Sequence, residues 1–84
     1  MRVEIVVRNR RRYHVINYLV QMGGKVTELL EVEGDGWTAY IEALEPVQVG
    51  LVEVPRDRLV IEGDERAVER VRSFMERNVR RVRK

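Results

Sequence analysis

Apolar and charged residues alternate at the start of the chain. Val3, Ile5 and Val7 are apolar, and Arg2 and Glu4 occupy intervening positions. A period of two residues is typical of a strand that buries only one of its faces. The sequence therefore predicts that the chain begins with a half-buried strand.

The spacing of apolar residues changes to three and four after Asn9. An asparagine at this position can cap a helix, and Gly23-Gly24 can supply the left-handed backbone at which a helix ends. We therefore expect a helix over roughly residues 10 to 22. Its buried face would carry Val15, Ile16, Leu19 and Met22.

Two strands and a hairpin are expected next. The ranges Lys25 to Glu33 and Trp37 to Leu44 are rich in β-branched, aromatic and aliphatic residues, and Gly34-Asp35-Gly36 lies between them. The two glycines permit the positive φ that a tight hairpin turn requires. We therefore predict that the two strands pair, with their register set by this turn.

The segment that follows the hairpin contains two prolines. Pro46 and Pro55 enclose an apolar stretch, and proline is rare in the interior of a strand. The prolines therefore predict two separate strands, Val47 to Val54 and Arg58 to Glu62.

The last part of the chain has the most regular pattern. Asp64 can cap a helix after Gly63, and apolar residues then follow at helical spacing. We expect an amphipathic helix over residues 65 to 79 whose apolar stripe belongs to the core. The five residues that follow could prolong the helix, form an edge strand or fray. The apolar stripe consists of Ala67, Val68, Val71, Phe74, Met75 and Val79.

These elements predict one α+β domain over residues 1–84. Strand, helix, hairpin, further strand and helix is the order of a ferredoxin-like sandwich, an antiparallel sheet with both helices on one face. A chain of 84 residues has a thin core. No predicted helix covers the apolar stretch Val47 to Val54, so we expect a homodimer that buries it.

Two stretches resemble small regulatory domains of the ACT and NIL type. They are the passage Gly23-Gly24-Lys25-Val26 and residues 59–71, which read LVIEGDERAVERV. The resemblance implies a ferredoxin-like domain that binds a small ligand in the loop after the first strand, beside a neighbouring subunit. That loop here reads Arg8-Asn9-Arg10-Arg11-Arg12, in place of the acidic residue and glycine usual in ACT-type domains.

Charge is distributed in three blocks along the chain. Residues 1–27 carry a net charge of +5, residues 28–65 carry −9 and residues 66–84 carry +6, within a total of +2. Such asymmetry bears on association rather than on fold. Charged residues make up 36% of the sequence, a composition typical of heat-resistant proteins, so we expect a thermophilic source.

The composition also bears on location. The chain contains no cysteine, which favours a cytoplasmic protein without disulfides or thiolate metal sites. The sequence shows no apolar signal segment and no membrane-spanning stretch, so no membrane partner is expected.

The run Asn9, Arg10, Arg11 and Arg12 is the main candidate binding site. Arginines beside the positive N-terminal end of a helix are unfavourable unless an anion lies close. Free backbone N–H groups and guanidinium groups together form a suitable site for phosphate or carboxylate. The alternative is that acidic residues of the protein itself pair with these arginines.

A second basic cluster is predicted on the last helix. The arginines of one solvent-exposed face could follow a phosphate backbone, which makes nucleic-acid binding the alternative function. They could equally be solvated surface, since Glu69 and Arg72 have the spacing of helix-stabilising pairs. The arginines of this face are Arg66, Arg70, Arg77 and Arg81.

Catalysis has little support in the sequence. One histidine, no cysteine and few hydroxyl side chains provide no nucleophile with a matching base. We therefore expect no enzymatic activity, no cofactor and no metal site. The favoured hypothesis is a small binding or assembly module, a homodimer that senses a small anionic ligand or contacts an acidic partner near Asn9 to Arg12. A nucleic-acid-binding protein and a protein–protein adaptor are the alternatives.

Overall fold

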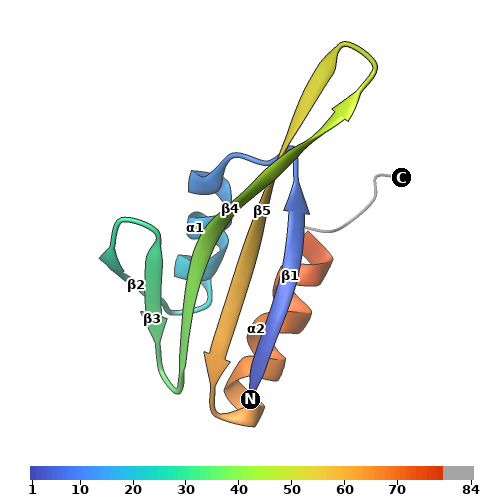
Figure 1. The fold of residues 1–84 in the computed structure, drawn as a ribbon. Helices are drawn as coiled ribbons and strands as arrows, with labels where there is room; N and C mark the ends of the chain where they lie inside the picture. The colour runs from blue at the N-terminus through green and yellow to red at the C-terminus, as the bar shows by residue number, and fades with distance from the viewer. Residues whose placement is uncertain (79–84) are drawn as a thin grey trace.

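The computed structural model describes residues 1–78 and shows a five-stranded antiparallel sheet with two helices on one of its faces (Figure 1). This confirms the predicted α+β class, with two helices and an antiparallel sheet. The helices are α1 (Arg12–Gln21) and α2 (Glu65–Asn78). The strands are β1 (Arg2–Arg8), β2 (Lys25–Glu28), β3 (Glu31–Gly34), β4 (Trp37–Val49) and β5 (Val52–Gly63).

The strand order in the sheet is β1-β5-β4-β3-β2, and all neighbours are antiparallel. The four strands after α1 therefore form a continuous meander, and β1 adds to its last strand. A ferredoxin-like chain follows the order β-α-β-β-α-β, whereas the described residues follow β-α-β-β-β-β-α. The ferredoxin-like arrangement is thus not confirmed.

The core lies between the sheet and the two helices. Alternate residues of β1 and β5 point into it, as the period of two predicted, and Val15 and Leu19 enter it from α1. The predicted stripe of α2 is confirmed as core, with Phe74 at its margin. Val79 and the tail of residues 80–84 lie outside the described residues. The α2 residues buried in the core are Ala67, Val68, Val71 and Met75.

Backbone conformation and backbone hydrogen bonds determine where α1 begins and ends. The predicted stop is confirmed, since Gly23 has a φ of 92° and its N–H donates to the carbonyl of Val20. The predicted cap is wrong. Asn9 has a φ of 54° and its N–H donates to the carbonyl of Pro55 at 2.9 Å, so the helix begins later, with Arg11 at the N-cap position and no side-chain cap.

The predicted single strand from Lys25 to Glu33 is wrong, because these residues belong to the two paired strands β2 and β3. Their turn is formed by Leu29-Leu30, which includes none of the glycines or prolines that usually mark a turn. Lys25 lies opposite Glu33, and Val26 lies opposite Val32. Cross-strand pairs of opposite charge and of aliphatic residues stabilise this short hairpin.

The predicted separate strand from Val47 to Val54 is also wrong. Strands β4 and β5 form one long hairpin that turns at Gly50-Leu51, and both prolines lie within strands. The pairing is irregular there, because Glu45-Pro46 on β4 face the single residue Pro55 on β5. A bulge of this kind tolerates proline, since it leaves backbone groups outside the ladder. The freed carbonyl of Glu45 accepts a hydrogen bond from Arg56 Nε at 2.8 Å.

Beyond this bulge the hairpin extends past the rest of the sheet (Figure 1). We call residues 45–54 the arm. Val47 pairs with Val54 and Val49 pairs with Val52, so the four valines share one face of the arm, because side chains alternate between the faces of a strand. The arm therefore has an aliphatic face that the helices leave uncovered.

Candidate functional site

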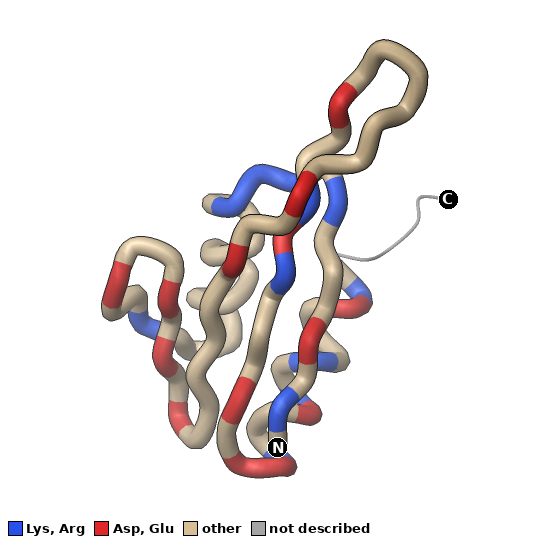
Figure 2. The backbone as a smooth tube through the Cα atoms, viewed as in Figure 1, with Lys and Arg blue, Asp and Glu red and all other residues tan. Residues whose placement is uncertain are grey.

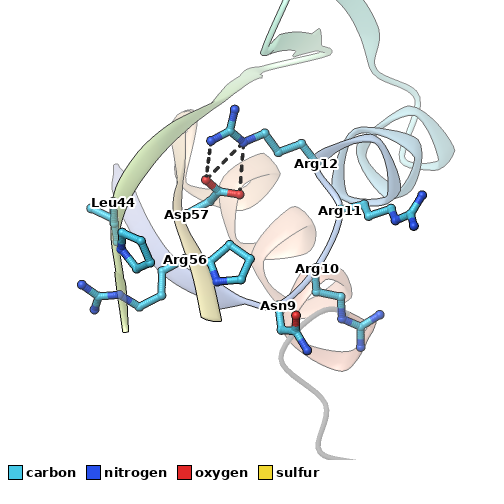
Figure 3. A pocket seen from close by; sticks show the side chains of 9 residues that line it. Asn9, Arg10, Arg11, Arg12, Leu44, Arg56 and Asp57 are labelled. Carbon is cyan, nitrogen blue, oxygen red and sulfur yellow. Dashed lines mark hydrogen bonds and ion pairs between the residues drawn. The ribbon is translucent and has the colours of Figure 1, made fainter. Parts of the chain in front are cut away.

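The predicted anion-binding residues meet the base of the arm at a cavity of about 520 Å³ (Figure 3). The backbone between β1 and α1 supplies one wall, and the bulge of β4 and β5 supplies the other. Sequence reasoning identified the first wall but assigned no role to Asp57 or Arg56 in the second. The lining residues are Asn9, Arg10, Arg11, Arg12, Leu44, Pro46, Pro55, Arg56 and Asp57.

Arg12 pairs with Asp57 across this cavity. Arg12 Nη2 donates to Asp57 Oδ1 at 3.0 Å, and Nε donates to the two carboxylate oxygens at 3.2 and 3.3 Å. Asp57 is only 8% exposed. The hydrogen bonds to Asp57, followed by its negative charge, raise the pKa of Arg12 above its ordinary value. For Arg12, the alternative of an internal ion pair is therefore the better interpretation.

Arg10 and Arg11 differ from Arg12. Neither side chain has a hydrogen-bond or ion-pair partner within residues 1–78, and both point away from the Arg12–Asp57 pair (Figure 3). Helix α1 has neither a side-chain cap nor an acidic residue in its first turn. These two arginines therefore lie beside uncapped N–H groups and the positive helix end, where an anion would be favourable.

The end of the arm exposes three aliphatic side chains, and Leu51 is the most exposed of the large apolar residues of 1–78. Leu51 is 100% exposed, and Val49 and Val52 are 59% and 62% exposed. From Pro46 to Val52 the arm carries no charged residue. The segment is the one from which the sequence predicted a homodimer surface, and the structure shows that the helices leave its end uncovered.

A second apolar surface was not anticipated. A cavity of about 430 Å³ lies between α1 and the β2–β3 turn, and we call it the α1 groove. Sequence reasoning missed it because the turn was assigned to the middle of a strand. Tyr13, Ile16 and Val20 have helical spacing on the same side of α1, and this signal could have revealed one wall. The lining residues are Arg12, Tyr13, Ile16, Asn17, Val20, Leu29 and Leu30.

The sheet face away from the helices is covered by ion pairs. Arg2 bonds Glu4 and Glu62, and its hydrogen bond with Tyr40, ahead of those with the carboxylates, raises the pKa of its guanidinium. Arg58 pairs with Glu4 at 3.6 Å and with Glu42 at 3.2 Å. Val60 lies between Glu4 and Tyr40 in the sheet and is buried on this face. The face therefore offers paired charges, not the stacked aromatic platform of a single-strand binder.

Basic residues also follow α2, as Figure 2 shows. Arg66, Arg70 and Arg77 are exposed, and we call them the α2 arginine stripe. Arg81, predicted for the same face, lies outside the described residues. Arg72 bonds Glu69, which confirms that predicted pair, and it also bonds Glu76 at 2.9 Å. The Arg72 hydrogen bond lowers the pKa of Glu69.

The single histidine and Thr27 of β2 each have a defined neighbour in the described part of the chain. His14 is exposed, and its ring lies 4.4 Å from the ring of Tyr13. Thr27 donates to the carbonyl of Glu31. Residues 1–78 contain no group of histidines, cysteines and carboxylates able to hold a metal ion. Neither of the two described helices is long and apolar enough to cross a membrane.

Comparison with known proteins identifies the family. The family model for archaeal MoaD-like protein matches residues 3–82, and the chain therefore belongs to this family. No curated protein matches the sequence. The resemblance to ACT and NIL domains is wrong. The two stretches that suggested it form the end of α1 with the start of β2, and the passage from β5 into α2. Turns of these kinds follow from local capping rules and occur in many folds.

Proposed function

We propose that this archaeal MoaD-like protein is a non-catalytic assembly module that associates with a second copy of itself through the arm. The observation that carries the proposal is the arm itself. It presents three exposed aliphatic side chains at its end, Val49, Leu51 and Val52. A hairpin that extends past the sheet and carries its apolar residues outward is typical of a contact surface.

The free energy gained by burying the end of the arm favours a dimer that uses both arms. Burying a large aliphatic side chain contributes about 1.5–3 kcal/mol. Scaled by the exposures of Val49, Leu51 and Val52, one buried arm end contributes about 3–7 kcal/mol. Association costs about 4–15 kcal/mol in lost translational and rotational freedom. One arm is therefore insufficient over most of this range, whereas two arms in a symmetric dimer contribute about 6–14 kcal/mol, which is comparable to the cost of association.

Sedimentation velocity over micromolar to submillimolar protein concentrations tests the proposal. The unmodified protein should form dimers, and Leu51→Asp should remain monomeric because a carboxylate would be desolvated at the contact. Val6→Asp is the matched control, since Val6 is an exposed valine on β1, outside the arm. A monomeric unmodified protein, or dimers of Leu51→Asp as stable as those of the unmodified protein, would contradict the proposal.

The unpartnered Arg10 and Arg11 favour a second candidate function, the binding of a small anion at the N-terminal end of α1. Inorganic phosphate should then raise the melting temperature of the protein in a saturable way. Arg10→Gln with Arg11→Gln should abolish that rise. Without phosphate the double variant should melt at the same temperature or slightly higher, because repulsion at the helix end is relieved. A lower melting temperature would show that these arginines serve internal ion pairs.

A further inference from the structure

The α1 groove has the properties of a receptor that residues 1–78 leave unfilled. Its walls come from α1 and from the β2–β3 turn, and they are mainly apolar. Leu29 at its margin is 87% exposed and Tyr13 is 64% exposed. The arm of the same copy does not fill the groove, since Leu51 at the end of that arm is fully exposed.

The arm and the groove are matched in polarity. Residues 46–52 of the arm carry no charge. Among the described residues, Arg12 is the only charged one that lines the groove, and it already pairs with Asp57. Inserting the arm end would therefore bury aliphatic surface on both sides without leaving a charge unpaired.

The size of a stable interface also favours this pairing. Stable interfaces involve about 20–30 residues on each side, and the arm has only ten. If each copy contributes its arm and its groove, the seven lining residues of the groove bring each side close to that range. The remaining exposed large apolar residues of 1–78 are scattered: Met1 precedes β1, Val6 lies in β1 and Val26 lies in β2.

We propose that the end of the arm, centred on Leu51, docks in the α1 groove of a second copy, and that two copies exchange their arms reciprocally. This inference rests on the proposed assembly function and adds the receiving site. It places Leu51 of one copy beside Asn17 and Leu29 of the other. A dimer in which arm packs on arm is the competing arrangement.

Disulfide trapping separates these arrangements, because the chain has no cysteine of its own. Single-cysteine variants Leu51→Cys and Asn17→Cys would be mixed and oxidised. We expect a crosslinked heterodimer in much higher yield than from Leu51→Cys mixed with the control Val6→Cys. Predominant crosslinking of Leu51→Cys to itself would show arm-to-arm packing, and would overturn the inference while leaving the proposed function standing.

A groove variant completes the test. Leu29→Asp should weaken dimerisation by about a hundredfold to ten-thousandfold, because a reciprocal dimer loses two buried leucines and each contributes a factor of about ten to a hundred. Because Leu29 is 87% exposed, its replacement leaves the core of the monomer unchanged, and circular dichroism would check the fold of the variant. If sedimentation shows dimers of the unmodified protein but neither the crosslink nor the Leu29→Asp effect is seen, the groove is not the receptor. If sedimentation shows only monomers, both the inference and the proposed function fail.

Discussion

Replacing Arg12 with alanine should destabilise the protein more than replacing its partner Asp57 with asparagine. The asymmetry follows from burial, since the Asp57 side chain is 11% exposed and the Arg12 side chain is 44% exposed. Without Arg12, a carboxylate would remain nearly buried and unpaired. Without the Asp57 charge, the arginine could turn toward water, and the asparagine would still offer an acceptor.

The loss of stability expected from breaking the Arg12–Asp57 ion pair lies between two known limits. Breaking a fully buried ion pair costs about 3–5 kcal/mol, whereas an exposed pair contributes about 0–1 kcal/mol. Since one partner of this pair is buried and the other is half exposed, we expect Arg12→Ala to cost about 1–3 kcal/mol and Asp57→Asn about 0.5–1.5 kcal/mol. For a domain of this size, 1 kcal/mol shifts the melting temperature by about 4–8 °C.

Urea unfolding followed by circular dichroism at neutral pH would measure these differences. Arg10→Ala is the matched control, because Arg10 adjoins the same cavity and has no side-chain partner within residues 1–78. It should change stability by no more than about 0.5 kcal/mol. Combining Arg12→Ala with Asp57→Asn should recover part of the loss, since no buried charge would remain. Equal effects of Arg12→Ala and Arg10→Ala would refute the reasoning and return Arg12 to the candidate anion ligands.

Three further outcomes are expected. Gly34→Ala should cost about 1–3 kcal/mol in urea unfolding and alter the fluorescence of Trp37, because a Cβ at Gly34 would overlap the buried indole; unchanged stability would contradict this packing. The protein should not retain duplex or single-stranded nucleic acid at ~50 mM salt; retention that weakens with salt, with a slope reduced by replacing the α2 arginine stripe, would support the nucleic-acid hypothesis instead. Because Arg72 lowers the folded pKa of Glu69, their pair contributes stability above about pH 4.3, the unfolded value, and loses it as the pH falls through the folded pKa. Glu69→Gln should therefore lose less stability on acidification, and an identical acid profile would exclude this contribution.

Local physical rules in the sequence determined the helices, the first strand and the α+β class. The apolar spacing of α2 predicted its buried face, and Asp64 caps that helix as expected, accepting a hydrogen bond from the Ala67 N–H at 3.2 Å. The end of α1 at Gly23-Gly24 could be predicted from the sequence equally well. Each of these features depends on residues within a few positions of one another, so a linear pattern contains the necessary information.

Tertiary structure alone decided the strand boundaries in the middle of the chain. The turn at Leu29-Leu30 has no glycine or proline to signal it, and its position follows from the pairing of β2 with β3. Pro46 and Pro55 were interpreted as strand ends because proline lacks an N–H, yet they meet at a bulge. Whether a missing donor breaks a strand depends on the opposite strand, which the local sequence does not specify.

The candidate site shows the same division. Residues Asn9 to Arg12 stood out in the sequence because three arginines beside a helix N-terminus conflict with a local rule. Which of them is available to a ligand depended on Asp57, which is 45 positions away from Arg12 along the chain. The β1–β5 pairing brings that carboxylate to the start of α1 and occupies Arg12, and it leaves Arg10 and Arg11 without a partner in residues 1–78. The division of charge into three blocks along the chain is thus a property of the sequence. Which individual charges pair is decided by contacts between segments that are distant in the sequence.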